Sequence, residues 1–258
     1  MLKTLMIFAS LATSSVQGAI ISEEKIAPYE YFLERGTLDH QDWSNFNSPP
    51  QSRYYTFKKA FELFEKNNGH IIVELGTSRS FTHGESIGCN SNNPIFWTPD
   101  QPENWDWGAG FFTKMVAICL QHLNPEIHTV DLVKSHIERC KIITKEQNHL
   151  IRYHVCSSVD YLNRCNFSNG IDLLYLDTGD MTPIEPTALL QLQEVKKIVE
   201  RNVIAKNGLI LIDDVKNQTP KKFGESSDLG KSKYALPYLL QNGFEIVMDE
   251  YQVLLRKK

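Results

Sequence analysis

The chain has 258 residues, of which 41% are hydrophobic and 22% charged, which is enough for one domain with a sizeable core. A formal net charge of -4 gives no general electrostatic footprint for nucleic acid. A nucleic-acid partner is therefore not expected, and small-molecule chemistry is favoured.

The first twenty residues combine one lysine, an apolar run from Leu5 to Ala12 and small residues near Gly18. This order predicts a secretory signal peptide over residues 1–18, cleaved after Gly18. The alternative is an N-terminal helix packed on the domain or a membrane-surface segment. Because the run is too short to cross a bilayer, no stable membrane span is expected.

Residues 19–52 form an N-terminal extension with little periodicity, ending in the polar, proline-marked stretch NFNSPPQSR. We expect the folded core to begin after it. The aromatic residues of YYTFKKAFELFEKNNG recur at spacings of three and four, which predicts an amphipathic helix that stops at Asn-Asn-Gly.

From residue 70 onward, short apolar runs alternate with helix-length segments near 109–123, 135–148 and 185–205. This alternation predicts a Rossmann-like, doubly wound and mainly parallel α/β sheet within a single domain over 53–258. The last two runs, GFEIVM and YQVLLRK, predict a C-terminal antiparallel hairpin. The five runs before them predict the parallel strands: HIIVEL, EIHTVDL, IRYHVCS, IDLLYLD and GLILIDD.

An insertion at about 83–108 separates the first strand from the next helix. It contains His83 and three of the four tryptophans, Trp97, Trp105 and Trp107. Loops of this length are often lids or binding loops, so these four side chains are candidates for contact with a sugar or an aromatic substrate. Alternatively, the tryptophans only anchor the loop to the body of the domain.

A polar residue closes each predicted parallel strand. If the sheet is parallel, Glu74, Asp131, Ser157, Asp177 and Asp213 lie on one rim, where open α/β sheets bind ligands. An aspartate at the end of the second strand can accept hydrogen bonds from ribose hydroxyls.

The loop after the first strand, VELGTSRSF, places Gly76 before the small residues Thr77 and Ser78, so the backbone can turn tightly beside a ligand. It lacks the second and third glycines of GxGxxG, and no basic cluster is available for a pyrophosphate. A nucleoside smaller than a dinucleotide is the better fit.

These motifs resemble the class I S-adenosylmethionine-dependent methyltransferases, and within them the metal-dependent O-methyltransferases of the catechol O-methyltransferase kind. The resemblance covers about 70–258 and rests on VELGTSRS, Asp131, LLYLDTGD, LILIDDV and the final hairpin. It implies a seven-stranded sheet with an antiparallel last strand and S-adenosylmethionine as cofactor. The implied cofactor contacts are Glu74 and Gly76 near the methionine, with Thr77 and Ser78 in the same loop, Asp131 on the ribose, and Ser157 or Ser158 near the adenine.

In metal-dependent members of that family, an Asp after the fourth strand and an Asp-Asn pair after the fifth hold a divalent cation. Asp177, Asp213 and Asp214 occupy these positions here, and their oxygens suit Mg²⁺. Asp180 stands where the relatives have a catalytic lysine. The metal held by Asp177 would therefore polarise the acceptor hydroxyl, and Asp180 or a nearby histidine would accept its proton, which makes Asp177 and Asp180 the expected catalytic residues. The alternative is that these aspartates cap turns and helices.

The favoured function is therefore methyl transfer to an oxygen of a small-molecule acceptor. One alternative is a non-catalytic, exported relative of the fold that binds a nucleoside or a carbohydrate, and another is an α/β enzyme that uses a metal for hydrolysis. The localisation stays open, because the signal-like N-terminus suggests export whereas a methyltransferase would find S-adenosylmethionine in the cytoplasm. The oligomeric state is also open.

Overall fold

The computed structural model of the chain describes residues 20–35, 53–79, 111–180, 183–215 and 229–258. The predicted signal peptide at 1–18 and the insertion at 83–108 lie outside these ranges. The described helices are α1 (Ile21–Ile26), α2 (Glu30–Arg35), α3 (Tyr54–Lys66), α5 (Phe111–Cys119), α6 (Lys134–Ile143), α7 (Ser158–Arg164), α8 (Ile184–Arg201) and α9 (Ala235–Gln241). The strands are β1 (Ile71–Leu75), β2 (Glu126–Asp131), β3 (Ile151–Val155), β4 (Ile171–Leu176), β5 (Ile204–Ile212), β6 (Phe244–Asp249) and β7 (Val253–Lys257).

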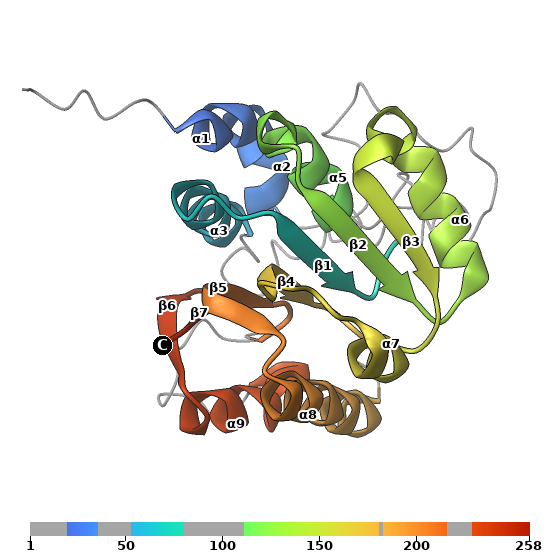
Figure 1. The fold of residues 1–258 in the computed structure, drawn as a ribbon, viewed down its shortest axis with the longest axis vertical. Coiled ribbons are helices and arrows are strands. Elements are labelled where there is room, and N and C mark those ends of the chain that lie inside the picture. The colour runs from blue at the N-terminus through green and yellow to red at the C-terminus, as the bar shows by residue number, and fades with distance from the viewer. Residues whose placement is uncertain (1–19, 36–52, 80–110, 181–182, 216–228) are drawn as a thin grey trace, which may run out of the picture.

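The seven strands form one sheet in the order β3-β2-β1-β4-β5-β7-β6 (Figure 1). Neighbours from β3 to β5 pair in parallel, and β7 pairs antiparallel with both β5 and β6. The predicted fold class, a mainly parallel seven-stranded sheet with a C-terminal antiparallel hairpin, is confirmed.

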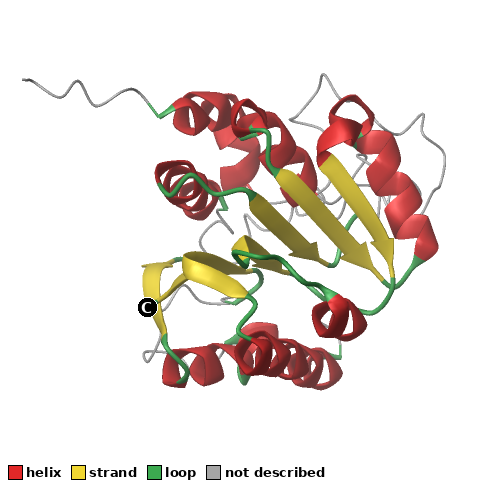
Figure 2. Ribbon diagram, in the orientation of Figure 1, coloured by secondary structure: helices red, strands yellow, loops and turns green. Residues whose placement is uncertain are grey.

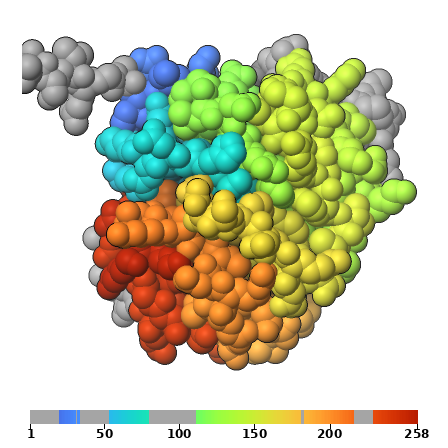
Figure 3. Space-filling model, viewed as in Figure 1, coloured from blue at the N-terminus to red at the C-terminus, as the bar shows by residue number. Residues whose placement is uncertain are grey.

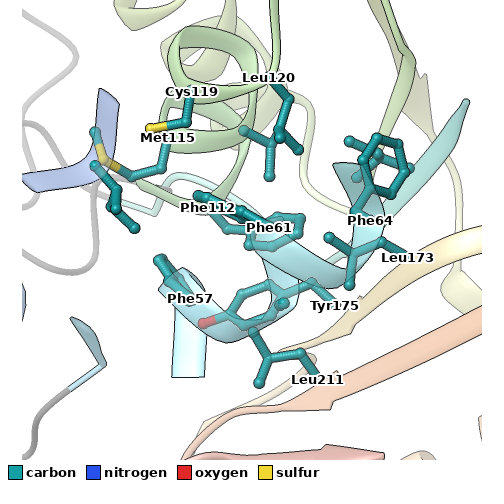
Figure 4. Close-up of a cluster of buried hydrophobic side chains, with 14 of the residues drawn as sticks. Phe57, Phe61, Phe64, Phe112, Met115, Cys119, Leu120, Leu173, Tyr175 and Leu211 are labelled. Carbon is teal, nitrogen blue, oxygen red and sulfur yellow. The ribbon is translucent and has the colours of Figure 1, made fainter. Parts of the chain in front are cut away.

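Helices cover both faces of the sheet, with α3, α5 and α6 on one face and α7, α8 and α9 on the other (Figure 2). On the first face, the ring of Tyr175 in β4 stacks on Phe112 of α5 with centroids 4.2 Å apart and meets Phe57 of α3 edge-on (Figure 4). Side chains of alternate strand residues are buried in two separate cores, one under each helical layer. This double burial explains why the strands read as continuous apolar runs.

The prediction that the folded core begins only after residue 52 is wrong. The helices α1 and α2 precede that point and lie against α3 and α5 (Figures 1 and 3), and α2 buries Phe32 and Leu33 in the same core. The backbone amide of Ser22, at the start of α1, donates a hydrogen bond of 2.9 Å to the carboxylate of Glu65 in α3. Local periodicity could not show this docking, because each helix has six residues and its partners are distant in sequence.

Three helix ends also differ from their predictions: the helices expected near 109–123 and 135–148 end at Cys119 and Ile143. The helix expected to continue to residue 205 ends at Arg201, because Asn202 adopts a left-handed conformation with φ of 54°, and β5 begins at Ile204. Within the described ranges, no helix combines the length and the apolar character needed to cross a bilayer.

Candidate functional site

The chain order of the sheet reverses between β1 and β4, and ligands of open α/β sheets bind outside the carboxyl ends of the strands at such a point. Gly76 follows β1 directly and has φ of 90°, a conformation that favours glycine. A Cβ atom at Gly76 would lie 2.5 Å from the backbone oxygen of Asp177, which follows β4. The loop after β1 therefore passes against the end of β4, and only glycine allows this approach.

Asp131, at the end of β2, ties this loop to the neighbouring strand. Its Oδ2 accepts a hydrogen bond of 3.0 Å from the backbone amide of Thr77, and its Oδ1 accepts one of 2.7 Å from the amide of Val133. His136 Nδ1 lies 3.2 Å from Oδ1. The structure thus brings the predicted cofactor residues Gly76, Thr77 and Asp131 together, while the contact of Asp131 with a ribose stays a prediction.

Glu74 lies inside the fold, behind this loop. It is 1% exposed, and its Oε2 accepts hydrogen bonds from the hydroxyls of Thr113 (2.5 Å) and Thr129 (2.6 Å). Burial raises its pKa to about 7, although these hydroxyls oppose the rise. Its two hydroxyl partners belong to α5 and β2, so Glu74 is held in the interior, and Ser78 is likewise fully buried. A contact of either residue with a cofactor stays a prediction.

Ser157 and Ser158 begin α7. The Ser157 hydroxyl accepts a hydrogen bond of 3.0 Å from the amide of Asp160, so this serine is the N-cap of the helix. Ser158 is buried and contacts Glu194 of α8. A contact of either serine with an adenine stays a prediction.

The three aspartates predicted as metal ligands converge. One carboxylate oxygen from each of Asp177, Asp213 and Asp214 lies within 4.8 Å of the other two. Two neighbouring parallel strands, β4 and β5, bring them together, since Leu176 pairs with Ile212 immediately before them.

Two protein cations, which the sequence analysis missed, lie among these carboxylates and offset two of their three negative charges. Lys231 Nζ is 2.5 Å from Asp177 Oδ1 and 2.9 Å from Asp214 Oδ2. Arg53 donates from Nε to Asp213 Oδ1 and from Nη2 to Asp213 Oδ2, each at 3.0 Å, and Nη2 is 3.2 Å from Asp214 Oδ1. Lys231 is 2% exposed and Arg53 is 3% exposed. We refer to these five side chains as the carboxylate cluster.

Neutral groups complete the hydrogen bonding around the cluster. Gln252 Nε2 donates to Asp213 Oδ1 at 3.0 Å and to the hydroxyl of Tyr175 at 3.3 Å, which connects the cluster to the aromatic core. The hydroxyl of Tyr251 donates to Asp214 Oδ1, and the Arg53 guanidinium lies 4.6 Å from the centre of the Tyr251 ring.

The charges within the cluster shift its pKa values in opposite directions. Burial raises the pKa of Asp177 to about 7, opposed by Lys231 and reinforced by Asp213 and Asp214. Burial would also raise the pKa of Asp214, but Lys231 and Arg53 outweigh it and hold that pKa below its ordinary value. Asp177 is 28% exposed. Its carboxyl group is therefore accessible at the rim of the sheet and can take up a proton near neutral pH.

A divalent cation does not fit this arrangement as it stands. Lys231 bridges Asp177 and Asp214, which are two of the three expected ligands, and Arg53 engages both oxygens of Asp213. The predicted convergence of the three acids is therefore found, but protein side chains supply the positive charge expected from Mg²⁺.

Asp180, the other expected catalytic residue, lies apart from the carboxylate cluster. Its side chain is 66% exposed and pairs with Arg79, and its backbone oxygen accepts a hydrogen bond of 2.7 Å from Thr187. The candidate substrate residues His83, Trp97, Trp105 and Trp107 lie outside the described ranges, so their roles stay predictions.

The sequence carried only weak signals for the two cations. Arg53 ends the polar stretch before α3 and is 160 residues from Asp213 in the chain. Lys231 follows Gly230, which has φ of 53° and packs on the backbone of Asp214. The excess of carboxylates at one rim signalled that a cation was needed, but its source depended on tertiary packing.

No family model and no curated protein matches this chain. Solved structures similar to it include monomeric WbdD, with 9% identity and a TM-score of 0.46, covering 88% of this chain but only 46% of WbdD. An SAH-bound methyltransferase of Podospora anserina has 12% identity and a TM-score of 0.47 over 92% of this chain and 88% of its own. Fibrillarin of Aeropyrum pernix with bound S-adenosylmethionine has 14% identity and a TM-score of 0.42 over 74% and 66%. Similarities of this size do not establish an activity.

Proposed function

We propose that this chain transfers the methyl group of S-adenosylmethionine to a hydroxyl oxygen of a small-molecule acceptor. The observation that carries the proposal is the meeting of Gly76, Asp131 and Asp177 at the point where the strand order reverses. A tight glycine loop and a strand-end carboxylate suit a nucleoside, and an adjacent carboxyl group with a raised pKa suits proton transfer. We propose that Thr77, Ser157 and Ser158 lie beside the nucleoside.

S-adenosylmethionine would supply a methyl group activated by a positively charged sulfur. Asp177 would accept the proton of the acceptor hydroxyl as the acceptor oxygen takes the methyl group, and S-adenosylhomocysteine would leave with the electron pair of the broken carbon–sulfur bond. Lys231 holds Asp177 Oδ1, which leaves Oδ2 to receive that proton. Because a base works best when its pKa is near the working pH, a value of about 7 suits this role.

The acceptor would lie on the exposed side of Asp177. We propose on sequence grounds that His83 and the tryptophans Trp97, Trp105 and Trp107 contact it. Indole rings and amides suit an aromatic or sugar-like molecule.

The cofactor proposal is tested by substituting Asp131→Asn and titrating the protein with S-adenosylhomocysteine in a calorimeter. Loss of a hydrogen bond to a charged group costs about 1.5–3 kcal/mol, so the dissociation constant should rise by roughly 10- to 150-fold. Asp172→Asn is the matched control, because Asp172 also accepts two backbone amides, from His70 (2.8 Å) and Ile71 (2.9 Å), at the opposite end of the sheet. Equal affinities of the two variants would contradict the assignment of Asp131.

A non-catalytic nucleoside-binding relative is the second candidate. It is favoured by the exposed Asp180 in place of a lysine and by Lys231, whose positive charge opposes proton uptake by Asp177. Saturable binding of S-adenosylhomocysteine without any methylated product from hydroxyl acceptors would support this candidate. N-terminal sequencing of the native protein addresses the related question of export, since a mature start at Ala19 would favour a role outside the cytoplasm.

A further inference from the structure

The ammonium group of Lys231 is seated in the carboxylate cluster as a bound cation would be. Its Nζ is 2.5 Å from Asp177 Oδ1, 2.9 Å from Asp214 Oδ2 and 3.4 Å from the backbone oxygen of Gly179. A lysine ammonium has three N–H donors, so these three oxygens match its full donor capacity.

Both chain neighbours of Lys231 fix it at this position. The backbone of Gly230 lies against the backbone oxygen of Asp214, where a Cβ atom would collide. The hydroxyl of Ser232 donates a hydrogen bond of 2.9 Å to Gln191 of α8, and both of these side chains are fully buried. The Lys231 side chain is itself 2% exposed. The fold therefore fixes the position of this positive charge, unlike that of a lysine on the surface.

The net charge of the carboxylate cluster with and without Lys231 indicates which ion its ammonium replaces. Lys231 and Arg53 together leave one excess negative charge when all three aspartates are ionised. Without Lys231, Arg53 alone would face three carboxylates, and two excess negative charges would remain. Three converging carboxylates supply the oxygen ligands that Mg²⁺ and Mn²⁺ prefer, and two excess negative charges would balance the two positive charges of either ion.

We propose that Lys231 is a built-in cation that takes the place of a divalent metal ion, and that removing its ammonium converts Asp177, Asp213 and Asp214 into a divalent-metal site. In the unaltered protein, a metal ion would have to displace an ammonium whose side chain is 2% exposed and whose chain neighbours, Gly230 and Ser232, are held by contacts of their own. We therefore expect the unaltered chain to bind divalent cations weakly. A reaction at this rim of the sheet should continue when a chelator removes the free divalent cations.

The test measures binding of Mn²⁺ by electron paramagnetic resonance, in which the signal of the free aqueous ion falls as the ion binds. The proteins compared are the full chain and its Lys231→Ala and Lys231→Met variants, of which the Met variant keeps the packing of the aliphatic stem. Lys233→Ala is the matched control, because Lys233 is nearby in the chain but pairs with Glu185 on the surface. Removing one full positive charge beside the ligands should strengthen Mn²⁺ binding at least about tenfold in either Lys231 variant.

Adding Asp177→Asn to Lys231→Met should abolish that gain, because a carboxylate ligand is lost. Stoichiometric Mn²⁺ binding by the unaltered chain, with no gain in the Lys231 variants, would show that metal displaces the ammonium and would overturn the proposal. Lys231 variants that fold and bind Mn²⁺ no better than Lys233→Ala would overturn it as well. Failure of the proposed methyl transfer would leave these outcomes unchanged, because the measurement reads cation binding alone.

Discussion

Arg53→Met should be among the most destabilising single substitutions in the carboxylate cluster. Arg53 and Asp213 are 3% and 1% exposed, and two hydrogen bonds of 3.0 Å join them. Removing one partner of a buried pair leaves an uncompensated charge, which costs about 3–5 kcal/mol. Because Gln252 continues to donate to Asp213 at 3.0 Å, we expect the lower end of this range, about 3 kcal/mol.

Urea unfolding of the original chain, Arg53→Met, Asp213→Asn and the double variant measures this cost. The free energy of unfolding of the double variant should fall by at least about 1 kcal/mol less than the sum of the falls in the two single variants, because the pair is broken only once. Arg256→Met is the control, since Arg256 pairs with Glu245 on the surface and should cost less than about 1 kcal/mol. An Arg53→Met loss no larger than that of the control would refute the view that Arg53 neutralises a buried carboxylate.

Two further predictions follow from raised pKa values. In folded protein the pKa of Glu74 is about 7 against an ordinary 4.5, so the unfolded chain loses this proton first and stability falls as pH rises from about 4.5 to 7. Glu74→Gln should remove about 3 kcal/mol of that fall, measured by urea unfolding at pH 4.5 and 8, and an unchanged pH dependence would contradict the raised value. For Asp177, with a pKa of about 7, turnover should decline as pH falls below 7 because the base becomes protonated. Asp177→Asn should lose most turnover at every pH and keep its affinity for S-adenosylhomocysteine, and a turnover profile identical to that of the original chain would exclude Asp177 as the base.

The sheet was predictable because its evidence is local. The strands β4 and β5 end in apolar runs that are followed directly by an aspartate, and the periodicity of α3 is visible within a few turns. Parallel strands end at the same edge of a sheet, and this rule alone was sufficient to predict that Asp177, Asp213 and Asp214 lie together.

The partners of these acids were not predictable, because they come from remote parts of the chain. Lys231 is 54 residues from Asp177, and Arg53 is 160 residues from Asp213. Neither cation lies in a periodic segment or a spaced motif. The sequence predicted a metal ion at these three aspartates, whereas the structure places the side chains of Lys231 and Arg53 there.

Methyl transfer by this chain is measured as acceptor-dependent formation of S-adenosylhomocysteine. The purified chain is incubated at pH 8 with S-adenosylmethionine, excess chelator and a pool of aromatic and sugar-like hydroxyl compounds, and the products are analysed by mass spectrometry. We expect S-adenosylhomocysteine together with one acceptor that has gained a methyl group, and equal rates with and without chelator. Saturable binding of S-adenosylmethionine with no methylated acceptor, or transfer that stops in chelator and returns with Mg²⁺, would contradict this expectation.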